Sequence, residues 1–157
     1  MVTPAKSAEG FALAVPIEVR FKDIDAMGHV NNAVYFTYFE NARIVYWRAL
    51  GLSRPRGEVA YVLARAECDF KSPATMDDRL VCHTRIGAVG RTSFTFEFLL
   101  RDEISSRVVA RGTTTQVMFD YEARSTRPIE PALKEAIRRF EGRPIPDSPS
   151  APAGARP

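Results

Sequence analysis

Residues 33–50 predict a helix that is apolar around most of its circumference. Its opposite side carries Phe36, Ile44 and Trp47 where the helix of a monomer would have polar residues. Such a helix must be enclosed by a sheet of its own chain and by a second subunit, so we expect a homodimer or a homotetramer. Its main face repeats apolar residues at spacings of three and four: Tyr35, Tyr38, Phe39, Ala42, Val45, Tyr46 and Ala49.

Capping residues mark both ends of this helix. Asn31 or Asn32 is a suitable N-cap, because a short side-chain oxygen accepts hydrogen bonds from the free N–H groups at a helix start. Gly51 predicts the end of the helix, since glycine readily takes the left-handed conformation found there.

Alternating apolar residues on either side of the helix predict β-strands. Residues 15–21 form one strand before it, and four follow it, at 62–70, 79–86, 94–100 and 108–119, with turns at 87–90 and 102–106. The four later strands predict an antiparallel meander. A flat sheet cannot enclose a helix, so we expect an α+β fold in which a curled antiparallel sheet of about five strands wraps the long central helix.

A chain of 157 residues is the size of a single domain. We expect a flexible leader at residues 1–13, one domain at 14–141 that ends in a short helix at 131–140, and a disordered tail at 142–157. The tail contains five prolines and almost no large apolar residues.

Composition excludes several classes of protein. The net charge is +3, from 22 basic and 19 acidic residues, and the basic residues form no dense stripe of the kind that binds nucleic acid. No apolar run reaches the roughly 18 residues of a membrane span. The N-terminus lacks the apolar core of a secretory signal, and we interpret Cys68 and Cys82 as reduced packing residues. These features predict a cytoplasmic protein.

The sequence lacks most of the usual catalytic motifs. It has no G-x-S-x-G motif, no glycine-rich nucleotide loop and only two histidines, His29 and His83. The histidines and cysteines do not have the spacing of zinc ligands, so we expect no metal and no cofactor. Carboxylate chemistry is therefore the leading option.

Asp23 and Asp25 lie just before the central helix, two residues apart. On an extended strand end they would point the same way, close to the positive end of the helix dipole and its free N–H groups. Aspartates also cap turns frequently, and the residues alone leave both interpretations open.

The stretch D-x-D-A-x-G-H-V-N-N-A-x-Y-F at residues 23–36, followed by F-E-x-A-R at 39–43, resembles the 4-hydroxybenzoyl-CoA thioesterase-like branch of the hotdog-fold superfamily. The resemblance continues through F-K-S-P-A at 70–74, D-x-L at 78–80 and R-T-S-F at 91–94, and covers about residues 15–120. It implies the hotdog fold, with the central helix inside a curled sheet, and acyl-CoA thioesterase activity.

The resemblance also implies roles for particular residues. Asp25 would be the catalytic carboxylate, which attacks the thioester carbonyl or activates a water, and the backbone N–H of Asn32 would polarise that carbonyl. Gly28 and His29 are candidate assisting residues. Arg91, Ser93 and Lys71 would contact the phosphates of CoA.

Other residues of the motif have simpler explanations. We expect Asp23 to be structural, and Glu40 and Arg43, three apart on the helix, to pair with each other.

Two alternative functions remain. A hotdog enzyme that hydrates an enoyl-CoA usually pairs an Asp with a His five residues later, but Asp25 and His29 are four apart. A non-catalytic acyl-CoA-binding or regulatory module would keep the fold and leave the thioester intact.

Overall fold

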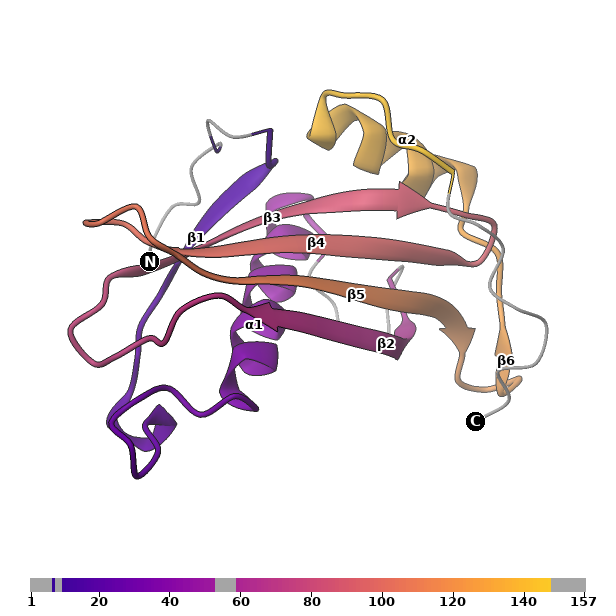
Figure 1. Ribbon diagram of the computed structural model, residues 1–157. Coiled ribbons are helices and arrows are strands. Elements are labelled where there is room, and N and C mark those ends of the chain that lie inside the picture. Colours follow the sequence, from indigo (N-terminus) through magenta and orange to yellow (C-terminus); the bar gives the residue numbers. More distant parts are fainter. Residues whose placement is uncertain (1–6, 8–9, 53–58, 148–157) are drawn as a thin grey trace.

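The computed structural model describes residue 7, residues 10–52 and residues 59–147. An antiparallel sheet lies against the long helix α1, and the shorter helix α2 lies beside β3 (Figure 1). This confirms the predicted α+β fold. The elements in chain order are β1 (Leu13–Ile17), the 3-10 helix η1 (Phe21–Asp23), α1 (Val34–Ala49), β2 (Tyr61–Phe70), β3 (Leu80–Val89), β4 (Ser93–Asp102), β5 (Val108–Asp120), β6 (Ser125–Thr126) and α2 (Pro131–Glu141).

The strand order is β1-β3-β4-β5-β2, with the short β6 paired to the end of β5. The predicted four-strand meander is therefore wrong in one respect, because only β3, β4 and β5 follow one another. The strand β2 pairs with β5 at one edge of the sheet, while β1 pairs with β3 at the other. A loop at 71–79 joins β2 to β3, and its length permits this crossover where a tight turn would not.

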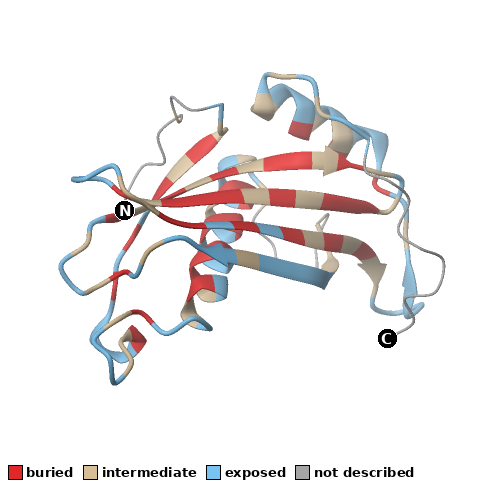
Figure 2. Ribbon diagram, in the orientation of Figure 1, coloured by how far each residue is buried: buried red, intermediate tan, exposed pale blue. Residues whose placement is uncertain are grey.

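The core lies between α1 and the face of the sheet that this helix covers (Figure 2). Residues on β3, β4 and β5 alternate between buried and less buried, whereas β2 is mostly exposed (Figure 2). Trp47, which we expected on an open side of the helix, is only 5% exposed. Its indole packs edge-on against Phe94 and Phe96 on β4. Phe36 and Ile44 are exposed as expected.

Local conformation differs from the sequence prediction at several strand ends. The first strand is shorter than expected, because the chain enters η1 at Phe21 and leaves that side chain 86% exposed. The predicted turn at 87–90 is a continuation of β3, where a register shift between Ile86 and Ala88 absorbs Gly87 as a bulge. Gly51 has φ +79° and follows the end of α1, as predicted.

Both expected flexible ends are partly attached to the sheet. Leu13 already belongs to β1, and the hydroxyl of Ser7 is 2.8 Å from Nδ1 of His83 on β3. Near the other end, the Val89 N–H donates to the carbonyl of Pro146 at 3.1 Å. The rest of the predicted leader and tail, residues 1–6, 8–9 and 148–157, lies outside the described residues.

Cys68 and Cys82 are both free, as predicted. Burial raises the pKa of the Cys82 thiol and, together with Asp69, raises that of Cys68 to about 11. Neither thiol is therefore a ready nucleophile at neutral pH. Within the described ranges, no helix is long and apolar enough to cross a membrane.

Candidate active site

Asp25 lies in a tight hairpin that connects η1 to α1. Ile24 and Val30 form an antiparallel bridge, and the Asp25 N–H donates to the carbonyl of His29 at 2.8 Å. Gly28 closes the turn with φ +80°, a conformation that favours glycine. A Cβ added at this glycine would meet no atom within 4 Å, so the backbone angle alone explains the residue.

The carboxylate of Asp25 is held by the hairpin itself. Its Oδ1 accepts hydrogen bonds from the N–H groups of Met27 at 2.8 Å and His29 at 3.3 Å. The residue is half-buried, and its Oδ2 accepts no hydrogen bond from the residues that the structure describes. A carboxylate that is oriented by two backbone donors and still reaches solvent can accept a proton or attack an electrophile.

Asp23 has an entirely different environment, so the two aspartates do not point the same way as predicted. It is 2% exposed and lies in η1, where a turn of 3-10 helix replaces the expected strand end. The Tyr38 hydroxyl donates to its Oδ2 at 3.0 Å, and the Arg20 guanidinium contacts both of its carboxylate oxygens. Burial opposes ionisation, but these hydrogen bonds outweigh it and lower the pKa of Asp23 below its usual range.

The start of α1 provides hydrogen-bond donors next to the hairpin. The predicted cap by Asn31 or Asn32 is wrong, because the helix begins one residue later than predicted and Ala33 is its N-cap, without a side-chain cap; Asn31 Oδ1 instead accepts from the Ala33 N–H at 3.0 Å in the turn before the helix. The side chain of Asn32 is exposed. Its backbone N–H makes no hydrogen bond to any residue in the described ranges. A free amide here, near the positive end of the helix dipole, suits a developing negative charge.

The candidate phosphate-binding residues lie at two ends of the sheet. Lys71 follows β2, next to the loop whose Ala74 carbonyl accepts from the Val30 N–H at 2.8 Å. It is therefore at the same end as the Asp25 hairpin. Arg91 and Ser93 lie at the start of β4, and this ten-residue strand is about 30 Å long.

One chain therefore brings Lys71, but not Arg91 or Ser93, towards Asp25. Lys71 and Arg91 are exposed, and Lys71 lies 3.6 Å from Asp69. Ser93 is 3% exposed, an environment that does not favour contact with a phosphate.

The expected pair between Glu40 and Arg43 does not form. Arg43 faces β5 and is buried, and its Nη1 lies 3.5 Å from the Thr114 hydroxyl, while Glu40 is exposed. The two side chains point to different sides of α1, because only Arg43 shares the face that packs on the sheet. The helical spacing alone could not show which face each residue would take.

Sequence reasoning missed the network around Asp23. The predicted pattern places Tyr38 on the apolar face of the helix and Arg20 on the outer face of a strand. A buried tyrosine hydroxyl requires a hydrogen-bond partner, and Arg20 and Asp23 are three residues apart. These two signals are present in the sequence, but the contact between them depends on how α1 lies against η1.

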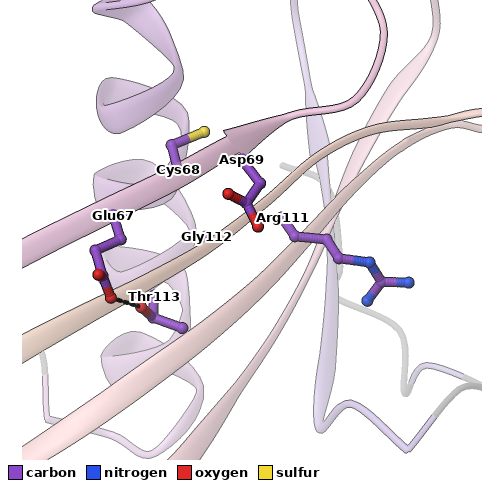
Figure 3. A pocket seen from close by; sticks show the side chains of 6 residues that line it. All are labelled: Glu67, Cys68, Asp69, Arg111, Gly112 and Thr113. Atoms are coloured by element: carbon purple, nitrogen blue, oxygen red, sulfur yellow. Dashed lines mark hydrogen bonds between the residues drawn. The ribbon is translucent and has the colours of Figure 1, made fainter.

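A small hollow of about 260 Å³ lies over the pair β2 and β5, towards the end of β2 that leads to Lys71. Glu67 accepts a hydrogen bond from the Thr113 hydroxyl there at 3.1 Å, and the Cys68 side chain points away from both of them (Figure 3). The hollow contains none of the predicted site residues. Its lining consists of Glu67, Cys68, Asp69, Arg111, Gly112 and Thr113.

The fold and the hairpin define a hotdog-type domain with a carboxylate beside the start of its central helix. The sequence matches the Thioesterase-like superfamily over residues 19–137. The chain belongs to this superfamily.

Individual relatives agree with this assignment. A thioesterase from Thermus thermophilus, solved with coenzyme A and zinc, is 35% identical, with a TM-score of 0.78 over 87% of this chain and 99% of that one. The long-chain acyl-CoA thioesterase FadM of Escherichia coli is 26% identical over 79% of this chain and 96% of its own length. The uncharacterised protein YsmA of Bacillus subtilis is 32% identical over 57% of this chain, and the match spans only 60% of that relative.

These findings confirm the predicted hotdog fold and the predicted class, that of thioester hydrolases. They support the wider superfamily without singling out its 4-hydroxybenzoyl-CoA branch. Across the part of the chain that the structure describes, no group of three or more His, Cys, Asp and Glu side chains could hold a metal ion.

Proposed function

We propose that this protein hydrolyses an acyl-CoA, or a related acyl thioester, to the free acid and the thiol. The observation that carries the proposal is the juxtaposition of Asp25, oriented by two backbone N–H groups, with the free Asn32 N–H at the start of α1. Relatives support the substrate class, since FadM is a long-chain acyl-CoA thioesterase and the Thermus thioesterase was solved with coenzyme A.

The chemistry needs few groups, because a thioester is already an activated acyl compound. In one route Asp25 takes a proton from water as the water oxygen attacks the carbonyl carbon. The C–S bond then breaks, and the thiolate leaves with that proton. In the other route an Asp25 oxygen attacks the carbonyl carbon, and the C–S bond breaks to release the thiolate. Water then hydrolyses the resulting mixed anhydride to the free acid and the Asp25 carboxylate, and a proton from this water passes to the thiolate. In both routes the Asn32 N–H stabilises the negative charge on the carbonyl oxygen.

The neighbouring residues have supporting roles in this proposal. Gly28 shapes the turn that presents Asp25, and His29 fixes the carboxylate through its backbone N–H. Lys71 would contact the CoA phosphates from the same end of the sheet, and Arg91 could join it only if a second copy of the chain brought that residue close.

A second copy is also part of the proposal. The outer edge of β2 is unpaired in the described chain, and an unpaired strand of ten residues is a ready surface for a further strand. Exposed apolar side chains lie nearby on β2 and α1, namely Leu63, Phe70, Phe36 and Ile44. We therefore propose a homodimer or homotetramer in the cytoplasm. Light scattering at micromolar concentration should give at least twice the mass of the chain, and a monomeric mass would refute this.

The activity is tested by a hydrolysis screen. Purified protein is incubated with short-chain, long-chain and aromatic acyl-CoAs and with an acyl-carrier-protein thioester, and the released thiol is measured. We expect enzyme-dependent thiol release from at least one CoA ester. Bound but intact acyl-CoA throughout the panel would instead identify a non-catalytic binding module.

A further inference from the structure

Asp23 joins the active-site hairpin to the central helix at two points. Its carboxylate accepts hydrogen bonds from the Arg20 backbone N–H at 3.0 Å, from the guanidinium of the same residue at 3.0 and 3.1 Å, and from the Tyr38 hydroxyl at 3.0 Å. Its main-chain carbonyl accepts from the Asn31 N–H at 2.8 Å. One residue therefore contacts both the interior of α1 and the segment just before Asn32.

The hairpin beyond Asp23 is internally rigid. Both hydrogen bonds to the carboxylate of Asp25 come from Met27 and His29, within the same hairpin, and the Ile24–Val30 bridge closes its base. Such a unit keeps its shape when it moves as a whole. Its position relative to α1 is set by three contacts: Asp23 on one side, the bond from Val30 to Ala74 on the other, and the bonds from Ala33 and Val34 to Asn31 at the helix start.

We propose that Asp23 is a positioning residue, which Tyr38 and Arg20 hold in place and which fixes the Asp25 hairpin against the start of α1. It thereby sets where Asp25 lies relative to the Asn32 N–H. This inference rests on the proposed function, because a rate effect requires Asp25 to carry the chemistry. A general base acts when its oxygen lies about 2.6–3.2 Å from the atom that carries the proton, and a displacement of about 1 Å can cost about a hundredfold in rate.

The test compares two identical substitutions on the same helix. Tyr38→Phe removes the hydrogen bond to Asp23 and keeps the ring, while Tyr46→Phe removes the corresponding bond from Tyr46 to Glu141 near the other end of α1. We expect Tyr38→Phe to lower kcat about tenfold or more with KM changed less than about twofold. Tyr46→Phe should keep kcat within about twofold, even where its melting temperature falls as far or further. Equal kcat values for the two variants would overturn the proposal.

A second measurement does not depend on activity. Amide hydrogen exchange of Asn31, whose N–H donates to the Asp23 carbonyl, should accelerate about tenfold in Tyr38→Phe and stay unchanged in Tyr46→Phe. If Tyr38→Phe does not fold, Arg20→Gln replaces it, because the Arg20 side chain is 43% exposed and the variant loses the guanidinium bonds to Asp23 while it keeps the backbone one. Unchanged exchange in the folded variant refutes the positioning role. Absence of thioester hydrolysis by the wild-type protein refutes the proposed function instead.

Discussion

At each end of α1 a buried tyrosine donates a hydrogen bond to a carboxyl group, but the two bonds connect the helix to different segments. Tyr38 donates to Asp23 near the start of the helix, and Tyr46 donates to Glu141 at 2.7 Å near its end. Both tyrosines lie on the buried face, eight residues apart, and both acceptors are buried carboxyl groups. The first contact holds a loop that leads to the candidate catalytic residue, whereas the second attaches α2 to the body of the protein.

The electrostatic surroundings of the two carboxyl groups differ accordingly. Asp23 has a guanidinium at hydrogen-bond distance, which outweighs burial and keeps its pKa low. Burial dominates at Glu141 and raises its pKa, although the Ile86 N–H donates to it at 2.6 Å and Arg143 lies nearby. A buried acid beside the site thus stays charged, while one inside the structural core is pushed towards its neutral form. Both carboxyl groups have an arginine nearby, but only at Asp23 do the hydrogen bonds and the positive charge outweigh burial.

The largest expected effect is a loss of kcat on substitution of Asp25, beside the start of α1. Asp25→Asn should lower kcat by about a hundredfold to ten-thousandfold, the range for losing a general base, and by more if Asp25 is a nucleophile. The melting temperature should change little, because the amide oxygen can still accept from the two hairpin N–H groups. The measurement is kcat and melting temperature on the best thioester found. Asp77→Asn, the same change at an exposed position, is the control. Near-normal turnover in Asp25→Asn would show that Asp25 is not the catalytic carboxylate.

Near the end of α1 we expect the opposite pattern, a loss of stability with kcat almost unchanged. Tyr46→Phe deprives the buried Glu141 carboxyl of a donor and should lower the free energy of unfolding by about 1–3 kcal/mol. For a chain of this size that corresponds to roughly 2–4 °C of melting temperature for each kcal/mol. Urea unfolding and a thermal melt measure the loss, and kcat of the folded enzyme is measured alongside. A loss of kcat without a loss of stability would contradict the division between the two ends.

The pH dependence of stability should have opposite signs at the two carboxyl groups. The low folded-state pKa of Asp23 adds stability above its unfolded pKa of about 3.9, and this is lost as pH falls through the folded value. Glu141 has a raised folded-state pKa, so its contribution declines as pH rises from about 4.3 through that folded value.

Urea unfolding of wild type, Asp23→Asn and Glu141→Gln from pH 3 to pH 7 tests this. The stability difference between wild type and Asp23→Asn should grow with rising pH, and the difference for Glu141→Gln should shrink. If both stability differences changed with pH in the same direction, the proposed contrast between the surroundings of Asp23 and Glu141 would be wrong.

The smallest effect concerns the ligand. Lys71→Ala should raise KM for CoA esters about twofold to fivefold with kcat nearly unchanged, since a contact to an exposed phosphate is equal in ground and transition states. High salt should reduce the effect. Arg91→Ala should also raise KM if a second copy brings that end of the sheet to Asp25. An unchanged KM in either variant would exclude that residue from the phosphate site.

The sequence predicted those features that depend on neighbours along the chain. Apolar spacing located α1 to within one residue at each end, and Gly51 marked its stop. The alternation of apolar residues located β4 and β5, because this pattern is visible within each strand and does not depend on which strand pairs with it. The motif around Asp25 identified the family and the candidate acid, because its residues lie in one continuous segment.

Tertiary structure decided everything that depends on contacts between distant segments. It placed β2 beside β5, buried Trp47 against β4, and turned Arg43 towards the sheet. It also separated the two aspartates, which the sequence shows only as neighbours. Asp23 faces Tyr38, fifteen residues away, while Asp25 remains in its own hairpin. Period and spacing describe which face of an element a side chain occupies, but only the packing of elements determines what that face meets.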